Sequence, residues 1–133
     1  MKEIQIYTNA QTRKGYALAF YRIECEGSAT EGFSVIENVN PVQSQMYAIL
    51  NGICRLRADC VITAYTNLQI LEQIWRHIKQ DGCVGRCANS EIWEHIFCHR
   101  YAQDLAIVWD SEKVEEVRTK AEQLLEYFLR LVK

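Results

Sequence analysis

The spacing of apolar residues divides the chain into an extended half and a mixed half. Residues 4–8 alternate between apolar and polar side chains, and residues 16–23 and 30–36 are further β-rich runs. Glycines at positions 15 and 27 mark the turns between them. The pattern therefore predicts three strands joined as an antiparallel meander.

After Pro41 the apolar residues recur at the three- and four-residue spacing of helices, interrupted by two short β-rich runs. The first predicted elements are a helix ending near Arg57, a strand at 60–66 and a helix ending by Gly82. A third helix, capped by Asn89 or Ser90, has an inward face that reaches Tyr101. A strand at 105–109 and a helix capped by Ser111 follow, and the buried face of this last helix runs from Val114 to Val132. Trp75, Trp93 and Trp109 all lie on apolar stripes, so we interpret them as core residues.

The predicted order is βββαβααβα, which favours a mixed α/β sheet: antiparallel at first, and parallel where helices cross over. Sites in such sheets form at the carboxyl ends of parallel strands. The residues that follow the runs IQIYT and CVITAYT are Asn9 and Asn67. Any functional crevice is expected beside these two asparagines.

Composition limits the classes of protein to which the chain can belong. It has 133 residues, 49% hydrophobic and 24% charged, which suits a single domain spanning 1–133. No stretch approaches the ~20 apolar residues that span a bilayer, and the first residues lack the pattern of a secretory signal. We therefore expect a cytoplasmic protein without a membrane partner. The formal charge of −2 disfavours tight, sequence-blind binding to nucleic acid.

The six cysteines suggest free thiols, because a cytosolic protein with an adequate core seldom needs disulfides. Cys83, Cys87, His95 and His99 form a candidate zinc site, since thiolates and imidazoles suit tetrahedral zinc. Their spacing is unconventional. We therefore prefer to interpret them as small buried thiols and exposed histidines without a metal.

Several motifs together resemble the ribonuclease H family, which cuts the RNA strand of RNA/DNA hybrids. The resemblance covers nearly the whole chain and implies a five-stranded mixed sheet of order 3-2-1-4-5 flanked by helices. IYTNAQ resembles the end of the family's first strand, AYTNLQIL its fourth-strand motif, and QMYAILNGICRL its glutamate-led helix; HIKQDG and NSEIW resemble the segment around its handle.

The family's chemistry needs four carboxylates around two magnesium ions. Carried over by position, the resemblance places the first aspartate on Asn9, the glutamate on Gln45 and the second aspartate on Asn67. The fourth falls on Glu122, which keeps the neighbouring leucines on the buried stripe, or on Lys120 in an alternative register. Asp110, just after the last strand, is a further candidate. Pro41 and Val42 stand where relatives contact the RNA 2′-hydroxyls, and neither can donate a side-chain hydrogen bond.

Three amides in place of three carboxylates predict a vestigial site that has lost its affinity for divalent ions. The resemblance thus implies an inactive domain that acts as a module binding nucleic acid or nucleoprotein weakly, RNA/DNA hybrid included. Two alternatives stay open: a protein-interaction scaffold without nucleic acid, and a weak metal-dependent nuclease using Glu122 and Asp110. No cofactor is expected, and Mg²⁺ or Mn²⁺ would matter only if nuclease activity remains.

Overall fold

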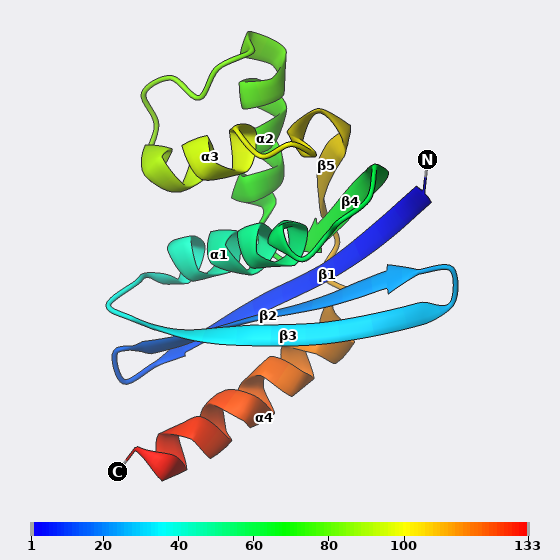
Figure 1. Cartoon of the computed structure of the whole chain (residues 1–133). Coiled ribbons are helices and arrows are strands. Elements are labelled where there is room, and N and C mark those ends of the chain that lie inside the picture. The colour runs from blue at the N-terminus through cyan, green and yellow to red at the C-terminus, as the bar shows by residue number, and fades with distance from the viewer. Residues whose placement is uncertain (1, 133) are drawn as a thin grey trace.

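The computed structural model describes residues 2–132 and, within them, contains five strands, four α-helices and one 3₁₀ turn (Figure 1). The elements are β1 (Lys2–Arg13), β2 (Tyr16–Cys25), β3 (Ser28–Glu37), α1 (Pro41–Cys54), β4 (Cys60–Thr66), α2 (Gln69–Asp81), α3 (Ser90–Phe97), the 3₁₀ turn Ala102–Asp104, β5 (Leu105–Trp109) and α4 (Glu115–Leu131).

The strands form one mixed sheet in the order β3-β2-β1-β4-β5. The first three are antiparallel, and β4 and β5 are parallel to β1. Two-residue turns close both hairpins: Lys14–Gly15 and Glu26–Gly27 all have positive φ, which matches the right-handed twist of the paired strands. The predicted fold class and strand order are confirmed.

Helices cover the two faces of the sheet unequally (Figure 1). α1, α2 and α3 pack on one face around a large apolar cluster that includes Ile6, Ile62 and Trp75. α4 alone covers the other face, where Val117, Ala121 and Leu125 meet residues of β2 such as Leu18 and Phe20. The sheet is therefore buried on both sides at its centre, while β3 and β5 form its two edges.

The start of α1 is fixed by a reciprocal cap. The Asn40 side chain accepts a hydrogen bond from the Gln43 backbone N–H, and the Gln43 side chain accepts one from the Asn40 N–H. Pro41 occupies the first helical position, where its missing N–H costs nothing. This cap sets the phase of α1 and therefore directs Gln45 toward the sheet.

Several predicted boundaries were wrong. β1 runs to Arg13 rather than ending at residue 8, because the β1–β2 hairpin pairs along its whole length. α1 ends at Cys54, three residues before Arg57. α3 ends at Phe97, so Tyr101 lies beyond it although its ring is buried. Long hairpin pairing and tertiary packing, rather than local apolar spacing, set these limits.

The region before α4 also differs from the prediction. Ser111 does not cap the helix, which begins at Glu115; instead the Asp110 carboxylate accepts a hydrogen bond from the Lys113 N–H. At the far end Val132 is exposed, whereas Leu129 is buried. The helix therefore presents a slightly rotated face to the sheet.

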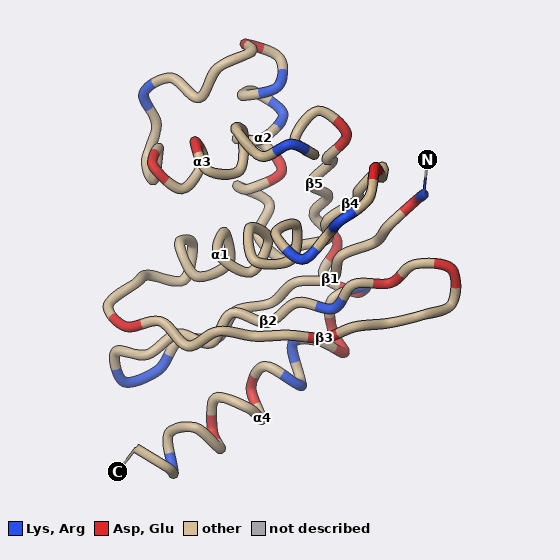
Figure 2. Tube along the Cα trace, viewed as in Figure 1, with Lys and Arg blue, Asp and Glu red and all other residues tan. Residues whose placement is uncertain are grey.

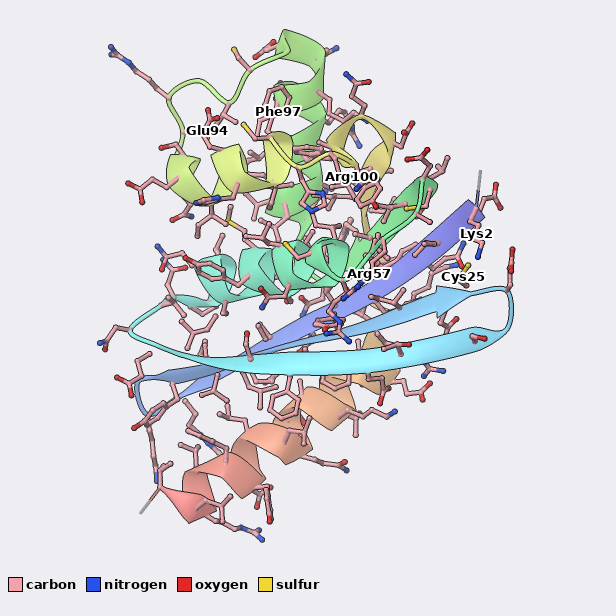
Figure 3. All side chains as sticks on the ribbon, viewed as in Figure 1. Lys2, Cys25, Arg57, Glu94, Phe97 and Arg100 are labelled. Atoms are coloured by element: carbon pink, nitrogen blue, oxygen red, sulfur yellow. The ribbon has the colours of Figure 1, made fainter. Side chains whose placement is uncertain are left out.

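Two of the three tryptophans are core residues as predicted. Trp75 and Trp93 stack with ring centroids 6.0 Å apart, and Phe97 meets Trp75 edge-on between α3 and α2 (Figure 3). The prediction for Trp109 was wrong: its side chain is 45% exposed, because β5 is an edge strand and Trp109 is its last residue.

In the described residues no helix combines the length and the apolar character that crossing a bilayer requires.

Truncation of Leu18 tests the cluster beneath α4. Leu18 is fully buried there, so Leu18→Ala should lower the free energy of unfolding by about 2–5 kcal/mol through lost burial and a residual cavity. Leu131→Ala, at an exposed position on α4, is the matched control and should change it by less than about 0.5 kcal/mol. Denaturant unfolding measures both; equal effects would show that α4 does not pack as described.

Candidate functional site

Asn9 and Asn67 occupy equivalent positions on the neighbouring parallel strands β1 and β4. The pairing runs from Lys2 with Cys60 to Tyr7 with Tyr65, a constant offset of 58 positions, and the same offset relates residue 9 to residue 67. Asn9 is fully buried within β1, whereas Asn67 is half-buried directly after β4. Asn67 therefore lies at the end of β4, whereas β1 continues past Asn9 to Arg13.

The Asn9 side-chain amide is hydrogen-bonded within the chain. Its Oδ1 accepts a hydrogen bond of 2.7 Å from Gln11 Nε2. Its Nδ2 is buried and has no hydrogen-bond partner among residues 2–132. A metal ion at this position would have to share the neutral carbonyl oxygen with the Gln11 amide.

Gln45 on α1 is the second amide of the candidate site, and it is almost completely buried. Its Nε2 donates to Thr8 Oγ1 at 2.5 Å, and the Thr8 hydroxyl donates in turn to the Tyr65 carbonyl at 2.7 Å. This chain of hydrogen bonds joins α1 to β1 and β4. A side chain that could only accept hydrogen bonds would break the chain at its first link.

Glu122 on α4 contributes the one carboxylate among the four candidate positions. It lines a shallow depression beside Gln11 and Arg13, so it lies close to the same stretch of β1 that holds Asn9. Its carboxylate is hydrogen-bonded and ion-paired to Arg118 on the preceding turn. The alternative residue, Lys120, lies elsewhere and pairs with Glu31 of β3 at 2.5 Å.

Asp110 lies near Asn67, because its N–H donates to the carbonyl of Thr66 at 2.9 Å. Its carboxylate, however, accepts from the Lys113 N–H and shapes the turn before α4. The two carboxylates considered for residual catalysis, those of Asp110 and Glu122, are therefore both engaged in local structure.

These residues do not fit the two-metal centre that the resemblance implies. Hard cations such as Mg²⁺ need several anionic oxygens to offset the cost of dehydration. Here three positions carry neutral amides, of which Asn9 and Gln45 hold internal hydrogen bonds, and the fourth carboxylate is neutralised by Arg118. No reaction step through a metal follows from this arrangement.

Sequence reasoning missed an aromatic pair beside the site. Tyr7 and Tyr65 are adjacent across β1 and β4 and stack with centroids 5.2 Å apart, and Lys113 Nζ lies 4.8 Å from the Tyr65 ring. Burial, with a smaller contribution from Glu24, raises the pKa of the Tyr7 hydroxyl. The only signal in the sequence was the shared position of the two tyrosines within matching strands.

The cysteines and histidines considered for zinc are not gathered into a ligand set. Among residues 2–132 no three His, Cys, Asp or Glu side chains are grouped as a metal site requires. Cys83 is exposed and Cys87 is half-buried with its thiol near the Val84 carbonyl, so the expectation of buried thiols was wrong for Cys83. Cys98 is exposed as well.

The His99 side chain takes part in local packing and hydrogen bonding. Its Nδ1 accepts from the Tyr101 N–H at 3.4 Å, and its ring packs on Tyr101 with centroids 5.2 Å apart. Burial, helped by the charge of Arg100, lowers the pKa of His99. The neutral ring is therefore the form that the fold favours.

Neither a family model nor a curated protein matches this sequence. Solved structures do match. LC11-RNase H1, isolated from compost by a metagenomic approach, is 18% identical, with a TM-score of 0.66 and coverage of 93% of both chains. The chain has the ribonuclease H fold.

Other solved structures with the ribonuclease H fold agree. RNase H1 from the halophilic archaeon Halobacterium salinarum is 14% identical, with a TM-score of 0.59, and the match covers 80% of this chain and 83% of that one. LC11-RNase H1 in complex with an RNA/DNA hybrid is 16% identical, with a TM-score of 0.54 and coverage of 79% and 83%.

Substitution of Gln45 by glutamate tests the amide chain. The new carboxyl would be buried, so its pKa should rise; ionised, it could not donate to Thr8. We expect Gln45→Glu to lower the free energy of unfolding by about 1–3 kcal/mol at pH 7. The loss should be small below about pH 4, where the carboxyl is protonated in both states, and should grow as pH rises through the unfolded-state pKa.

Gln73→Glu, at an exposed position of α2, is the matched control and should show no such pH dependence. Chemical unfolding at pH 4 and pH 7 measures both variants. A Gln45→Glu protein as stable as the parent at pH 7 would mean that the amide does not hold Thr8.

Proposed function

We propose that this chain is a ribonuclease H-like domain that does not cleave nucleic acid and that binds RNA/DNA hybrid or other nucleic acid weakly. The observation that carries the proposal is the buried Gln45 amide, which donates to Thr8 where catalysis would need a metal-binding carboxylate. Such a side chain stabilises the scaffold and gives no charge to a magnesium ion.

The binding half of the proposal is supported by likeness to structures that hold nucleic acid. One is the LC11-RNase H1 complex with an RNA/DNA hybrid; another is the foamy viral protease-reverse transcriptase in complex with dsDNA, which is 8% identical with a TM-score of 0.58 and 92% coverage of both chains. Fold likeness alone does not establish function, so the surface must also offer contacts to phosphate.

A small basic cluster beside the candidate site offers such contacts. Arg13, the last residue of β1, and Lys14 in the β1–β2 turn share a depression with Arg130 of α4, which is ion-paired to Glu126 in the same depression. Along the rest of α4, acidic residues alternate with basic ones (Figure 2). Few phosphates can be neutralised by such a surface, so binding should be weak and only moderately dependent on salt.

Exposed apolar side chains favour a second candidate, a protein-interaction scaffold. Phe33 on β3 and Trp109 on β5 are both about half exposed, at opposite edges of the sheet. Protein partners without nucleic acid would use these edges rather than the Arg13 turn. Binding assays with hybrid therefore separate the two functions.

For the proposed function we expect a hybrid dissociation constant in the range of about 10⁻⁴–10⁻⁶ M at physiological salt, with no cleavage in Mg²⁺ or Mn²⁺. Arg13→Glu combined with Lys14→Glu should weaken binding at least about tenfold and flatten its salt dependence, because two phosphate contacts are lost. Fluorescence anisotropy with a labelled hybrid, and gel analysis of the same sample after incubation, measure both properties.

Arg57→Glu combined with Arg86→Glu makes the same change in charge at two exposed positions away from the β1–β2 turn and is the control. Equal weakening by both doubles would mean non-specific attraction. Cleavage that disappears in Glu122→Ala would instead establish the weak nuclease, and no binding at 1 mM protein would leave only the scaffold function.

Restoring the carboxylates tests whether the vestigial site keeps its geometry. Asn9→Asp, Gln45→Glu and Asn67→Asp together should restore binding of Mn²⁺ or Mg²⁺, since Glu122 would supply a fourth carboxylate. Without metal the triple variant should be less stable than the parent, because clustered carboxylates repel one another. Single substitutions should bind metal little or not at all, since the ligands act as a unit.

Calorimetry with and without chelator measures this recovery. If the triple variant binds neither ion and its stability does not depend on chelator, the four positions do not form one site.

A further inference from the structure

The two edges of the sheet differ in how far side chains cover their outward-facing backbone groups. At the β5 edge, side chains of α2 occupy the outward-facing backbone groups: Trp75 Nε1 and Lys79 Nζ donate to the Leu105 carbonyl, and Glu72 accepts from the Trp109 N–H. β5 is also only five residues long. This edge is closed to another strand by the devices that natural sheets use against edge pairing.

Among residues 2–132, no side chain is hydrogen-bonded to a backbone group of β3. β3 is ten residues long, contains no lysine, arginine or proline, and lies foremost in Figure 1 with neither α1 nor α4 across its outer side. Its two acidic residues are Glu31, which is held by Lys120, and Glu37 at the end of the strand. Phe33, at the centre, is 53% exposed. A long, nearly neutral edge with an exposed aromatic residue favours pairing with another strand.

Hairpin geometry decides which backbone groups of β3 face outward. Cys25 and Ser28 flank the two-residue turn and form its hydrogen-bonded pair, and such pairs alternate along an antiparallel ladder. The even-numbered residues of β3 therefore bond to β2. The N–H and C=O groups of the odd-numbered residues, Phe33 among them, point to the free edge.

We propose that β3 pairs antiparallel with β3 of a second copy of this chain, with the two-fold axis at Phe33. A two-fold axis perpendicular to the sheet keeps α4 of both copies on the same face of the joined sheet. In that arrangement odd-numbered residues of one β3 pair with odd-numbered residues of the other. Phe33 of one copy then faces Phe33 of the other as a hydrogen-bonded pair. The two sheets join into one continuous ten-stranded sheet.

The sequence of β3 is complementary to itself in this register. Glu31 faces Val35 of the second copy, and Ala29 faces Glu37, so no like charges meet across the axis. The two phenylalanines form a cross-strand aromatic pair. In each copy Phe33 and Leu124 of α4 line one open groove, so the pair lies beside Leu124. On the opposite face Gly32 leaves room for the Tyr21 side chain, since a Cβ there would lie 2.2 Å from the Tyr21 hydroxyl oxygen.

Sedimentation equilibrium on the full chain tests the dimer. The parent should dimerise at micromolar to submillimolar concentrations, and Phe33→Glu, which places two carboxylates against each other, should weaken association at least about tenfold. Phe33→Tyr keeps the aromatic pair and should associate within about threefold of the parent. A parent that remains monomeric at 1 mM, or a dimer unaffected by Phe33→Glu, overturns the proposal.

Charge substitutions at Ala29 test the register of the proposed strand pairing. They also keep the proposal testable if the Phe33→Glu variant does not fold. Ala29 is exposed, and each dimer contains two Ala29–Glu37 pairs. Ala29→Lys should strengthen association by about two- to thirtyfold, and Ala29→Glu should weaken it by a similar factor. Equal association of the two Ala29 variants overturns this pairing. So does a monomeric parent whose binding to a labelled hybrid is lost in Phe33→Glu, since nucleic acid would then occupy the edge.

Discussion

The hydrogen-bond chain from Gln45 through Thr8 to the Tyr65 carbonyl is the constraint on which the site depends. It ties the first helix to the two central parallel strands at the point where a ribonuclease H fold would hold its metal ions. An ionised glutamate at the same position would remove the donor and bury a charge. The Gln45 amide therefore stabilises the scaffold through a hydrogen bond that an ionised carboxylate could not make.

The other candidate positions follow the same logic. The Asn9 carbonyl oxygen is taken by Gln11, and the Glu122 carboxylate is taken by Arg118. The Asn9 carbonyl oxygen and one oxygen each of Glu122 and Asp110 thus accept hydrogen bonds from donors of this chain. The two apolar clusters that hold the helices against the sheet consist of side chains alone.

The order of elements along the chain was predictable from alternation, helical spacing and short glycine turns, whereas the strand order β3-β2-β1-β4-β5 came from the family resemblance. The offset of 58 positions that relates Asn9 to Asn67 matches the β1–β4 register, although β1 continues past Asn9 to Arg13. The partners of the site were not predictable: nothing in the sequence indicates that Gln11 bonds to Asn9, or that Asp110 rather than Ser111 shapes the turn before α4. Trp109 is exposed because β5 is an edge strand. The local spacing of apolar residues does not indicate which strand forms an edge.

Side-chain NMR of the parent protein tests the central claim most directly. The Nε2 hydrogens of Gln45 and the Nδ2 hydrogens of Asn9 are buried, so their signals should be protected from solvent exchange and unchanged by a 10-fold excess of diamagnetic Mg²⁺. Saturable shifts of both amide signals at millimolar Mg²⁺ would contradict the account, because the amide oxygens would then be metal ligands.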